Sequence, residues 1–319
     1  MGLKLLIVNY HYIRELLPAC GIYNITPSAF EKQLESIHSH GYCFISLENL
    51  HHAIRNKDPQ SLNAKSCLIT FDDGLKESYE LGLSILDRKG IPGAFYISSF
   101  TLGRNKVLDV HKFHHIQSVM DVNEILSYFP VAFSARLDAV TGEAIKNQYI
   151  WDNQETAKVK YLINFLLNAH ERAGVVQKLF EACITSEQEF AANLYMTEDE
   201  IKDIASRNSL GSHGASHSPL ACLPKKEICH EIAESRSALM NFTGVNIEAI
   251  SYPYGGESAV SDVVFEAAGK NNFISGMTMM RGLNSEIDIL SGYLQLKRFD
   301  TNDVFGGKSE AMYKDLFHD

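Results

Sequence analysis

Apolar runs alternate with amphipathic segments over the first hundred residues of the chain. Four runs have the length and composition of buried strands: residues 3–10, 41–47, 67–71 and 93–98. Between the first two runs, Phe30, Leu34 and Ile37 recur at helical spacing, directly after Thr26 and Pro27, which are typical of a helix start. Strands that alternate with helices predict parallel βα units, whose functional groups lie at the carboxyl ends of the strands.

This alternation stops in the middle of the chain and then resumes. From about residue 103 to residue 192 the apolar positions keep mostly helical spacing, which predicts a helical insertion on the rim of a barrel. The alternation resumes at Thr197, where Glu200 completes a capping box. Further strands are expected around Leu210 and at residues 247–252, 272–277 and 294–299, with a helix at residues 262–270. We therefore predict a single barrel domain over residues 1–319, interrupted at about 103–192.

The strand in "LITFDDG" ends in two adjacent carboxylates, Asp72 and Asp73. Like charges at neighbouring positions repel each other, so a cation close to both is expected. The first strand ends in "NYHY", and the carboxyl ends of parallel strands share one edge of the sheet. His11 is therefore expected to lie near the two aspartates.

The segment "SLGSHGASHSPL" also follows a predicted strand and contains His213 and His217, four residues apart. If His217 begins a helical turn, both imidazoles face one point, as a divalent metal requires. A lone pair of histidines at this spacing is weak evidence. With one aspartate, however, two histidines form a facial set that leaves positions for water and substrate. One of the two aspartates would then bind the metal while the other stays available as a base.

Composition and charge exclude several classes of partner. Apolar residues make up 45% of the chain and charged residues 21%, as in an average soluble domain. The formal net charge of −10 argues against nucleic acid as a partner, because nucleic-acid binding normally needs a basic patch. The six cysteines are scattered without a Cys-x-x-Cys pair, which argues for reduced thiols rather than a zinc cluster.

The beginning of the sequence bears on localisation. The segment "LKLLIVNYHY" becomes polar too early for a signal peptide, and no apolar run reaches transmembrane length. We therefore expect a cytoplasmic protein without a transmembrane segment, unless a leader was removed before Met1.

The motifs "TFDDG", "SHGASH" and "SYPYG", in this order, resemble those of the NodB-homology polysaccharide deacetylases of the carbohydrate esterase family 4 group. The resemblance covers the barrel on both sides of the insertion and implies the distorted (β/α) barrel of that family. It also implies that Asp72 is the catalytic base and that the backbone N–H of Tyr254 helps to hold the oxyanion. Asp73, His213 and His217 would bind one divalent metal, expected to be zinc, although cobalt, nickel and iron suit the same ligands.

The sequence departs from the family pattern at several positions. Gly214 replaces the usual hydroxyl residue, Ser251 stands where an arginine commonly opens the third motif, and no clear Leu-x-His segment supplies the usual general acid. Arg298, near the end of the last strand, is a candidate to pair with Asp72 and hold it ionised. His11 is our candidate for the proton donor, and a subset of exopolysaccharide deacetylases has a similar Tyr-His at the first strand.

The resemblance implies hydrolysis of an N-acyl group, expected to be N-acetyl, from an amino-sugar by metal-activated water, with Asp72 as base. The substrate would be a polysaccharide, an oligosaccharide, or a lipid- or nucleotide-linked precursor. A catalytically weak or inactive carbohydrate-binding pseudoenzyme is the alternative, because the usual general acid is missing. An Fe(II) oxygenase is disfavoured, since it generally needs His-x-Asp/Glu on one strand.

The insertion contains a histidine cluster in "VHKFHHI", formed by His111, His114 and His115. It lacks a partner motif, so surface or pocket-lining residues are the favoured interpretation. If the insertion covers the active site, one of these histidines competes with His11 for the role of proton donor. We favour His11, because a strand end is a more rigid platform than a loop.

Overall fold

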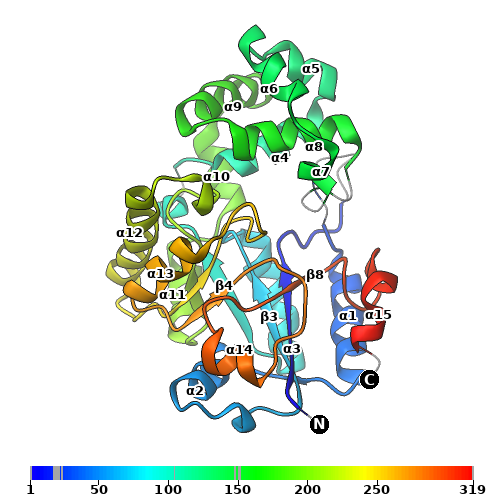
Figure 1. Ribbon diagram of the computed structural model, residues 1–319, viewed down its shortest axis with the longest axis vertical. Coiled ribbons are helices and arrows are strands. Elements are labelled where there is room, and N and C mark those ends of the chain that lie inside the picture. Colours follow the sequence, from blue (N-terminus) through cyan, green and yellow to red (C-terminus); the bar gives the residue numbers. More distant parts are fainter. Residues whose placement is uncertain are drawn as a thin grey trace. The chain divides into compact units, whose positions relative to one another are not determined.

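The computed structural model describes residues 2–16, 22, 24–103, 105–146, 149 and 152–317 (Figure 1). The chain forms two compact units. The barrel unit comprises the described parts of residues 1–16, 24–104 and 192–319, and the helical unit comprises those of residues 17–23 and 105–191. That residues 1–319 act as one domain, with an insertion at about 103–192, stays a prediction.

The barrel unit is built on one parallel sheet. Its strands are β1 (Lys4–Tyr10), β2 (Cys43–Phe44), β3 (Lys65–Phe71), β4 (Gly93–Ile97), β5 (Leu210–Ser212), β6 (Ala249–Ser251), β7 (Ser275–Met277) and β8 (Phe299–Asp300). The strand order is β7-β6-β5-β4-β3-β1-β8, and β2 pairs with β3. Leu296 bridges to Met277 at the end of β7, and Phe299 of β8 pairs with Val8 of β1. This segment therefore connects the two edges of the curled sheet, which is the distorted (β/α) barrel that the sequence predicts.

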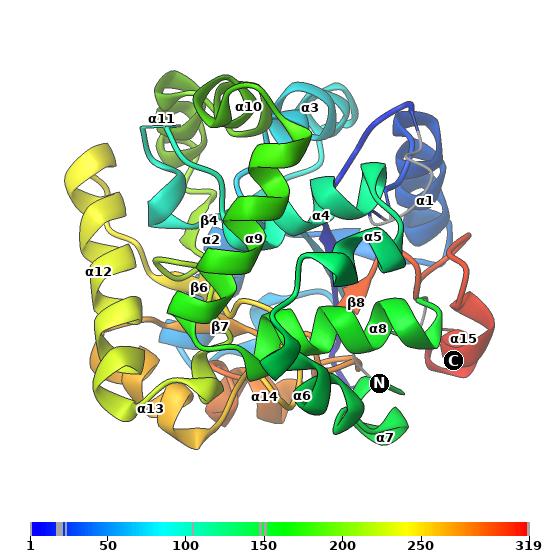
Figure 2. The same ribbon diagram turned by 90° about the horizontal axis from the view of Figure 1, so that it is seen from above.

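Helices surround the sheet, as Figure 2 shows for α1, α3, α12 and α13. The helices of the barrel unit are α1 (Pro27–Ser39), α2 (Leu47–Arg55), α3 (Ser84–Lys89), α11 (Glu198–Ser206), α12 (Lys225–Thr243), α13 (Asp262–Lys270), α14 (Glu286–Ser291) and α15 (Glu310–Phe317). Local sequence explains their starts. Thr26 caps α1 by accepting a hydrogen bond from Ala29 N, and Thr197 forms the predicted capping box with Glu200.

The helical unit contains mainly short helices. They are α4 (Asp109–Val119), α5 (Val122–Ser127), α6 (Ser134–Asp138), α7 (Gly142–Lys146), α8 (Gln154–Tyr161), α9 (Ala169–Cys183) and the start of α10 (Glu187–Leu194). Val176, Leu179 and Phe180 of α9 are fully buried. Lys112 of α4 is also buried and lies 3.1 Å from Glu187, which neutralises its charge. None of the helices in the described residues is both long and apolar enough to cross a membrane.

The side chains of β1 alternate between two cores, as the period of a strand requires. Leu6 and Val8 pack with the surrounding helices. Leu5 and Ile7 belong to a second core on the inner face, to which α2 and α14 also contribute. Asn9 lies two residues after Ile7 and therefore on the inner face, where it is completely buried. The inner face is thus apolar at the start of β1 and polar at its end.

Strand β3 repeats this change from apolar to polar. Leu68 belongs to the inner core, and Thr70 and Asp72 follow it at intervals of two residues. Thr70 is the register partner of Asn9. The polar side chains of the two strands consequently meet at the carboxyl end of the barrel.

Two strands differ from the sequence-based expectation. The run at 41–47 forms only the short β2, because Ser46 begins α2 through a capping box with Asn49. In the run at 294–299, only Phe299 belongs to β8. The reason is that this segment crosses from β7 to β1, so it pairs with each neighbour over a short stretch.

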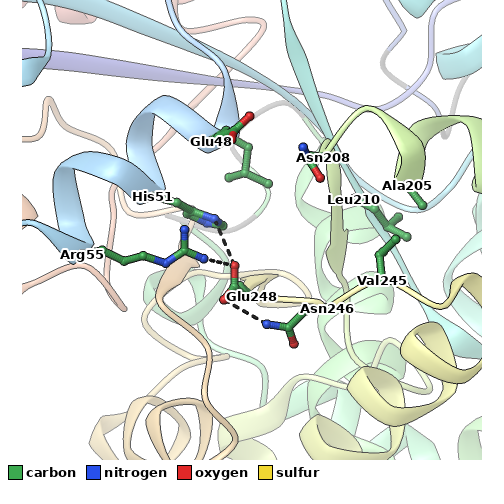
Figure 3. A pocket seen from close by; sticks show the side chains of 10 residues that line it. Glu48, His51, Arg55, Ala205, Asn208, Leu210, Val245, Asn246 and Glu248 are labelled. Atoms are coloured by element: carbon green, nitrogen blue, oxygen red, sulfur yellow. Dashed lines mark hydrogen bonds and ion pairs between the residues drawn. The ribbon is translucent and has the colours of Figure 1, made fainter.

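A cavity of about 220 Å³ lies at the opposite end of the barrel, beside the first residues of β5 and β6 (Figure 3). Among its polar side chains, Arg55 pairs with Glu248, and Asn246 Nδ2 donates to Glu248 Oε1 at 3.0 Å. Leu210 and Val245 form an apolar wall. Functional groups of such barrels lie at the carboxyl ends of the strands, so we interpret this cavity as structural.

His51, which lines this cavity, makes stability dependent on pH. Burial lowers the pKa of His51 to about 4, although Glu248 acts in the opposite direction. Protonation therefore favours the unfolded chain, in which the histidine pKa is ~6.5. Its contribution to stability is complete above ~pH 6.5 and is lost as the pH falls towards 4, by about 3 kcal/mol.

We predict that the free energy of unfolding falls more steeply between pH 7 and pH 4 in the wild type than in His51→Gln. Urea unfolding at several pH values measures this difference. The exposed neighbour provides the control, and His52→Gln should follow the wild type. Equal pH dependence of His51→Gln and the wild type would contradict the prediction.

Candidate active site

Three buried side chains converge at the carboxyl ends of β3 and β5. Asp73 Oδ1 lies 3.3 Å from His213 Nε2 and 3.2 Å from His217 Nε2. The three candidate ligand atoms all lie within 4.8 Å of one another. Ligand atoms ~2.1 Å from a metal, at angles between octahedral and tetrahedral values, stand about 3.0–3.4 Å apart. The donor set of Asp73, His213 and His217 therefore fits a divalent metal in both chemistry and spacing.

The orientation of His213 is fixed by the strand beside it. Its Nδ1 lies 2.8 Å from the carbonyl oxygen of Ser251, which can only accept a hydrogen bond. Nδ1 therefore carries a hydrogen, and Nε2 is the ring nitrogen that faces Asp73 Oδ1. Burial alone lowers the pKa of His213, but Asp72 and Asp73 outweigh it and raise the pKa. A hydrogen bond from the ring nitrogen that does not face the metal, here from Nδ1 to the Ser251 carbonyl, is the usual way in which a histidine ligand is oriented.

The loop that carries both histidines is shaped by Gly214 and by α12. Gly214 has φ +71°, a conformation that residues with a Cβ rarely adopt, which explains the glycine in place of the usual hydroxyl residue. Glu231 accepts hydrogen bonds from the backbone N–H groups of Ala215 and Ser216, at 3.2 and 2.8 Å. Ser235 Oγ donates to the Gly214 carbonyl at 2.8 Å. Hydrogen bonds within the chain thus hold the loop.

Left-handed backbone conformations concentrate at this site. Asp73, His217 and Tyr254 have φ values of +77°, +59° and +61°. The only other non-glycine residues with positive φ in the described part of the chain are Lys57, Asn208 and Asn272. Each such residue costs of order 1–3 kcal/mol, and strain of this kind clusters at functional sites. The backbone therefore independently marks these three residues.

Asp72 is buried and accepts hydrogen bonds from three side chains. Arg298 donates to both of its oxygens, to Oδ1 at 3.0 Å and to Oδ2 at 2.8 Å. Asn9 Nδ2 and Ser251 Oγ each donate to Oδ2 at 3.0 Å. Burial would raise the pKa of Asp72, but the charges of Arg298 and His213 and the hydrogen bond from Arg298 lower it to about 2. Asp72 is therefore ionised at neutral pH.

Arg298 reaches Asp72 from the segment that leads into β8 and is completely buried. Its Nε donates to the Thr278 carbonyl at 2.9 Å, and its Nη1 donates to Asn9 Oδ1 at 2.9 Å. Nη2 also donates to Ser251 Oγ at 2.8 Å. The structure therefore brings Arg298 to Asp72, while the side chain of Ser251, at the position where an arginine is common, donates a hydroxyl hydrogen bond to Asp72.

His11 contacts Asn9 in this residue set, and Tyr254 contacts His217. His11 is half-buried, and its Nε2 lies 3.4 Å from Asn9 Nδ2. Its carbonyl accepts a hydrogen bond from Ser78 Oγ at 3.0 Å, in the π-helical segment Ser78–Leu83. The Tyr254 ring packs edge-on against His217, with 5.0 Å between centroids. The catalytic roles of both residues stay predictions.

Asn9, Thr70 and the Ser251 hydroxyl also belong to the site, although the sequence did not predict a function for them. All three are fully buried polar residues within strands. Asn9 interrupts the apolar run of β1 at an inward position. This interruption is the feature of the sequence that could have identified Asn9 as a functional residue. The sequence did not show that Asn9 contacts Asp72 and Arg298, because both lie far from Asn9 along the chain.

The histidine cluster of "VHKFHHI" lies on α4, in the helical unit. His115 packs against Phe190 and Phe180, with ring centroids 4.7 and 5.9 Å apart. The His111 and His114 rings lie 6.0 Å apart. His115 thus packs among aromatic rings, and a role of any of the three as proton donor stays a prediction.

Comparisons with known proteins bear on the family and the fold. Residues 172–273 match the protein family described as Polysaccharide deacetylase, and this range includes "SHGASH" and "SYPYG". No curated protein sequence matches the chain. Among solved structures, the deacetylase PplD of Streptococcus pyogenes in complex with acetate is 18% identical, with a TM-score of 0.59 and 99% of each chain covered.

Two further solved structures are similar. IcaB from Ammonifex degensii is 16% identical, with a TM-score of 0.60, over 100% of this chain and 98% of that chain. A de-N-acetylase from Aggregatibacter actinomycetemcomitans is 14% identical, with a TM-score of 0.59, over 97% and 99%. The family match and the barrel together confirm the resemblance to the NodB-homology polysaccharide deacetylases.

The donor set predicts how metal binding responds to mutation. His213→Ala removes one of the three ligands. The affinity for zinc should therefore fall by at least ~10²-fold, because losing a ligand weakens metal binding more than losing a residue that only hydrogen-bonds to a ligand. Metal analysis of dialysed protein and zinc titration measure this. His230→Ala, which removes an exposed histidine of α12, is the control and should bind zinc normally. Wild-type affinity in His213→Ala would exclude this metal site.

Proposed function

We propose that the chain is a metal-dependent carbohydrate N-deacylase. It hydrolyses an N-acyl group, expected to be N-acetyl, from an amino-sugar of a glycan or a glycan precursor. One observation carries the proposal: the Asp73, His213 and His217 donor set lies next to an ionised, buried carboxylate, Asp72. The family match supports a carbohydrate deacetylase, and the acetate in the PplD structure is the product that N-deacetylation would release.

Asp73, His213 and His217 would hold the metal, for which zinc is expected. When bound, a divalent metal polarises a carbonyl oxygen and lowers the pKa of water. The spacing of the ligand atoms and the Nδ1–H of His213, which donates to the Ser251 carbonyl, support this assignment. Cobalt, nickel or iron would suit the same donors.

The remaining steps use groups of the chain. Asp72 takes a proton from the water whose oxygen bonds to the acyl carbon, and the Tyr254 N–H donates to the resulting oxyanion. As the C–N bond breaks, its electron pair goes to nitrogen, which takes a proton from His11. Asp72 then releases its proton to solvent and His11 regains one. The net reaction converts an N-acyl amine and water into a carboxylic acid and an amine.

The pseudoenzyme alternative is a catalytically weak or inactive carbohydrate-binding protein. The convergence of Asp73, His213 and His217 and the contact between Arg298 and Asp72 support the enzyme over this alternative. Acetate release, screened over N-acetylated sugars, nucleotide sugars and short oligosaccharides with metal-loaded protein, tests the proposal directly. Binding without any release would support the pseudoenzyme instead.

The adjacent aspartates should respond differently to the same substitution. Asp72→Asn should retain the metal and lower kcat by roughly 10²- to 10⁴-fold, as expected for a lost general base. Asp73→Asn should lose both metal and turnover. Metal content and kcat of the two variants measure the difference. Equal metal loss in both variants would mean that the two roles are wrongly assigned.

His11 is expected to act in proton transfer and not in metal binding. His11→Ala should keep the metal and lower kcat by roughly 10²- to 10⁴-fold. His111→Ala, His114→Ala and His115→Ala are the comparison set and should keep normal turnover. If His11→Ala is active while one of these three is not, the proton donor comes from the helical unit.

A further inference from the structure

The two oxygens of Asp72 are not equivalent. Oδ2 accepts three hydrogen bonds, from Asn9 Nδ2, Ser251 Oγ and Arg298 Nη2, at 3.0, 3.0 and 2.8 Å. Within the described part of the chain, Oδ1 accepts one, from Arg298 Nη1 at 3.0 Å. An ionised carboxylate offers about two acceptor positions on each oxygen. Oδ2 is therefore fully occupied, and one acceptor position is left on Oδ1.

The hydrogen bonds of the Asn9 amide determine its orientation. Its Oδ1 accepts from Arg298 Nη1 at 2.9 Å and from Thr70 Oγ1 at 3.0 Å. Rotating the amide by half a turn would place its NH₂ group against the guanidinium and its oxygen against the Asp72 carboxylate. Both contacts would then be repulsive, because a guanidinium has no acceptor and a carboxylate has no donor. Asn9 therefore donates to Asp72 Oδ2 and is itself held by Arg298 and Thr70.

We propose that Asn9 and Ser251 are positioning residues that hold Asp72 by Oδ2 and leave Oδ1 as the atom that accepts the proton. This inference rests on the proposed function, in which Asp72 is the base. Arg298 alone cannot select an oxygen, because its two-pronged contact engages both. The additional donors on Oδ2 break this symmetry. Because β1 and β6 supply them from two separate strands, they also restrict rotation of the carboxylate.

The test uses Asn9→Ala, Ser251→Ala and the double variant, each metal-loaded. Metal content and KM should match the wild type, because none of the changes removes a proposed ligand and the Ser251 carbonyl remains for His213. We expect kcat to fall roughly 10-fold in each single variant and about 10²-fold in the double variant, as a misplaced catalytic group typically gives. In a crystal structure of the double variant, the Asp72 carboxylate should be rotated relative to the wild type.

A second buried amide serves as the matched control. Gln33 donates to the carbonyls of Thr301 and Phe305, at 2.8 and 3.0 Å, and accepts from Tyr10 on the outer side of β1. Gln33→Ala should lower stability without changing kcat of the folded, metal-loaded protein. If Asn9→Ala does not fold, Ser251→Ala still removes one donor from Oδ2 and provides the same comparison of kcat, KM and carboxylate orientation.

Unchanged kcat in the variants, or an unrotated Asp72 carboxylate in the double variant, would overturn the inference. A fall in kcat accompanied by equal metal loss would also overturn it, since the effect would then pass through the ligands. If the wild type releases no acyl group from any substrate, the proposed function fails. The carboxylate orientation in the double variant then still decides whether Asn9 and Ser251 hold Asp72.

Discussion

The buried pair of Asp72 and Arg298 is the interaction on which the carboxyl end of the barrel depends. Both side chains are almost completely removed from water, at 2% and 0% exposure, so neither charge can be left without its partner. Breaking such a pair from one side typically costs ~3–5 kcal/mol. Asn9, Thr70, Ser251 and the Thr278 carbonyl provide further hydrogen bonds, so β1, β3, β6 and the approach to β8 must meet in one register. Because the two buried charges must stay paired, the strands that carry their hydrogen-bond partners must keep this arrangement.

Local sequence predicted the elements better than their contacts. The apolar runs gave β1, β3 and β4, and capping residues gave the starts of α1 and α11, because these signals act over a few residues. The contact between Asn9 and Arg298 spans 289 positions, and no periodicity encodes it. The rule that functional groups gather at the carboxyl ends of parallel strands supplied part of this information, since it placed His11 near Asp72 and Asp73. It could not indicate which oxygen each donor would reach.

The site is where the sequence departs from local preferences. Asp72 and Asp73 place two like charges side by side, and Asn9 is a polar residue buried inside an apolar strand. An aspartate, a histidine and a tyrosine adopt left-handed backbone conformations, which are unfavourable for residues other than glycine. Proteins tolerate such conflicts mainly at functional sites, where the surrounding structure compensates for them. Of these signals, the adjacent aspartates and the asparagine in the apolar run can be read without coordinates. The backbone conformations emerge from the tertiary structure.

The hydrogen bonds between α12 and the loop that carries His213 and His217 determine how metal binding is coupled to folding. Glu231 and Ser235 fix the backbone around Gly214, and the Ser251 carbonyl fixes the His213 ring, through hydrogen bonds within the chain. A metal that binds here meets ligands whose conformational entropy has already been lost during folding. Zinc fingers behave differently, because their ligands become ordered only when the metal binds. A chelator should therefore leave this barrel folded, and exchange of one metal for another should proceed on a preformed scaffold.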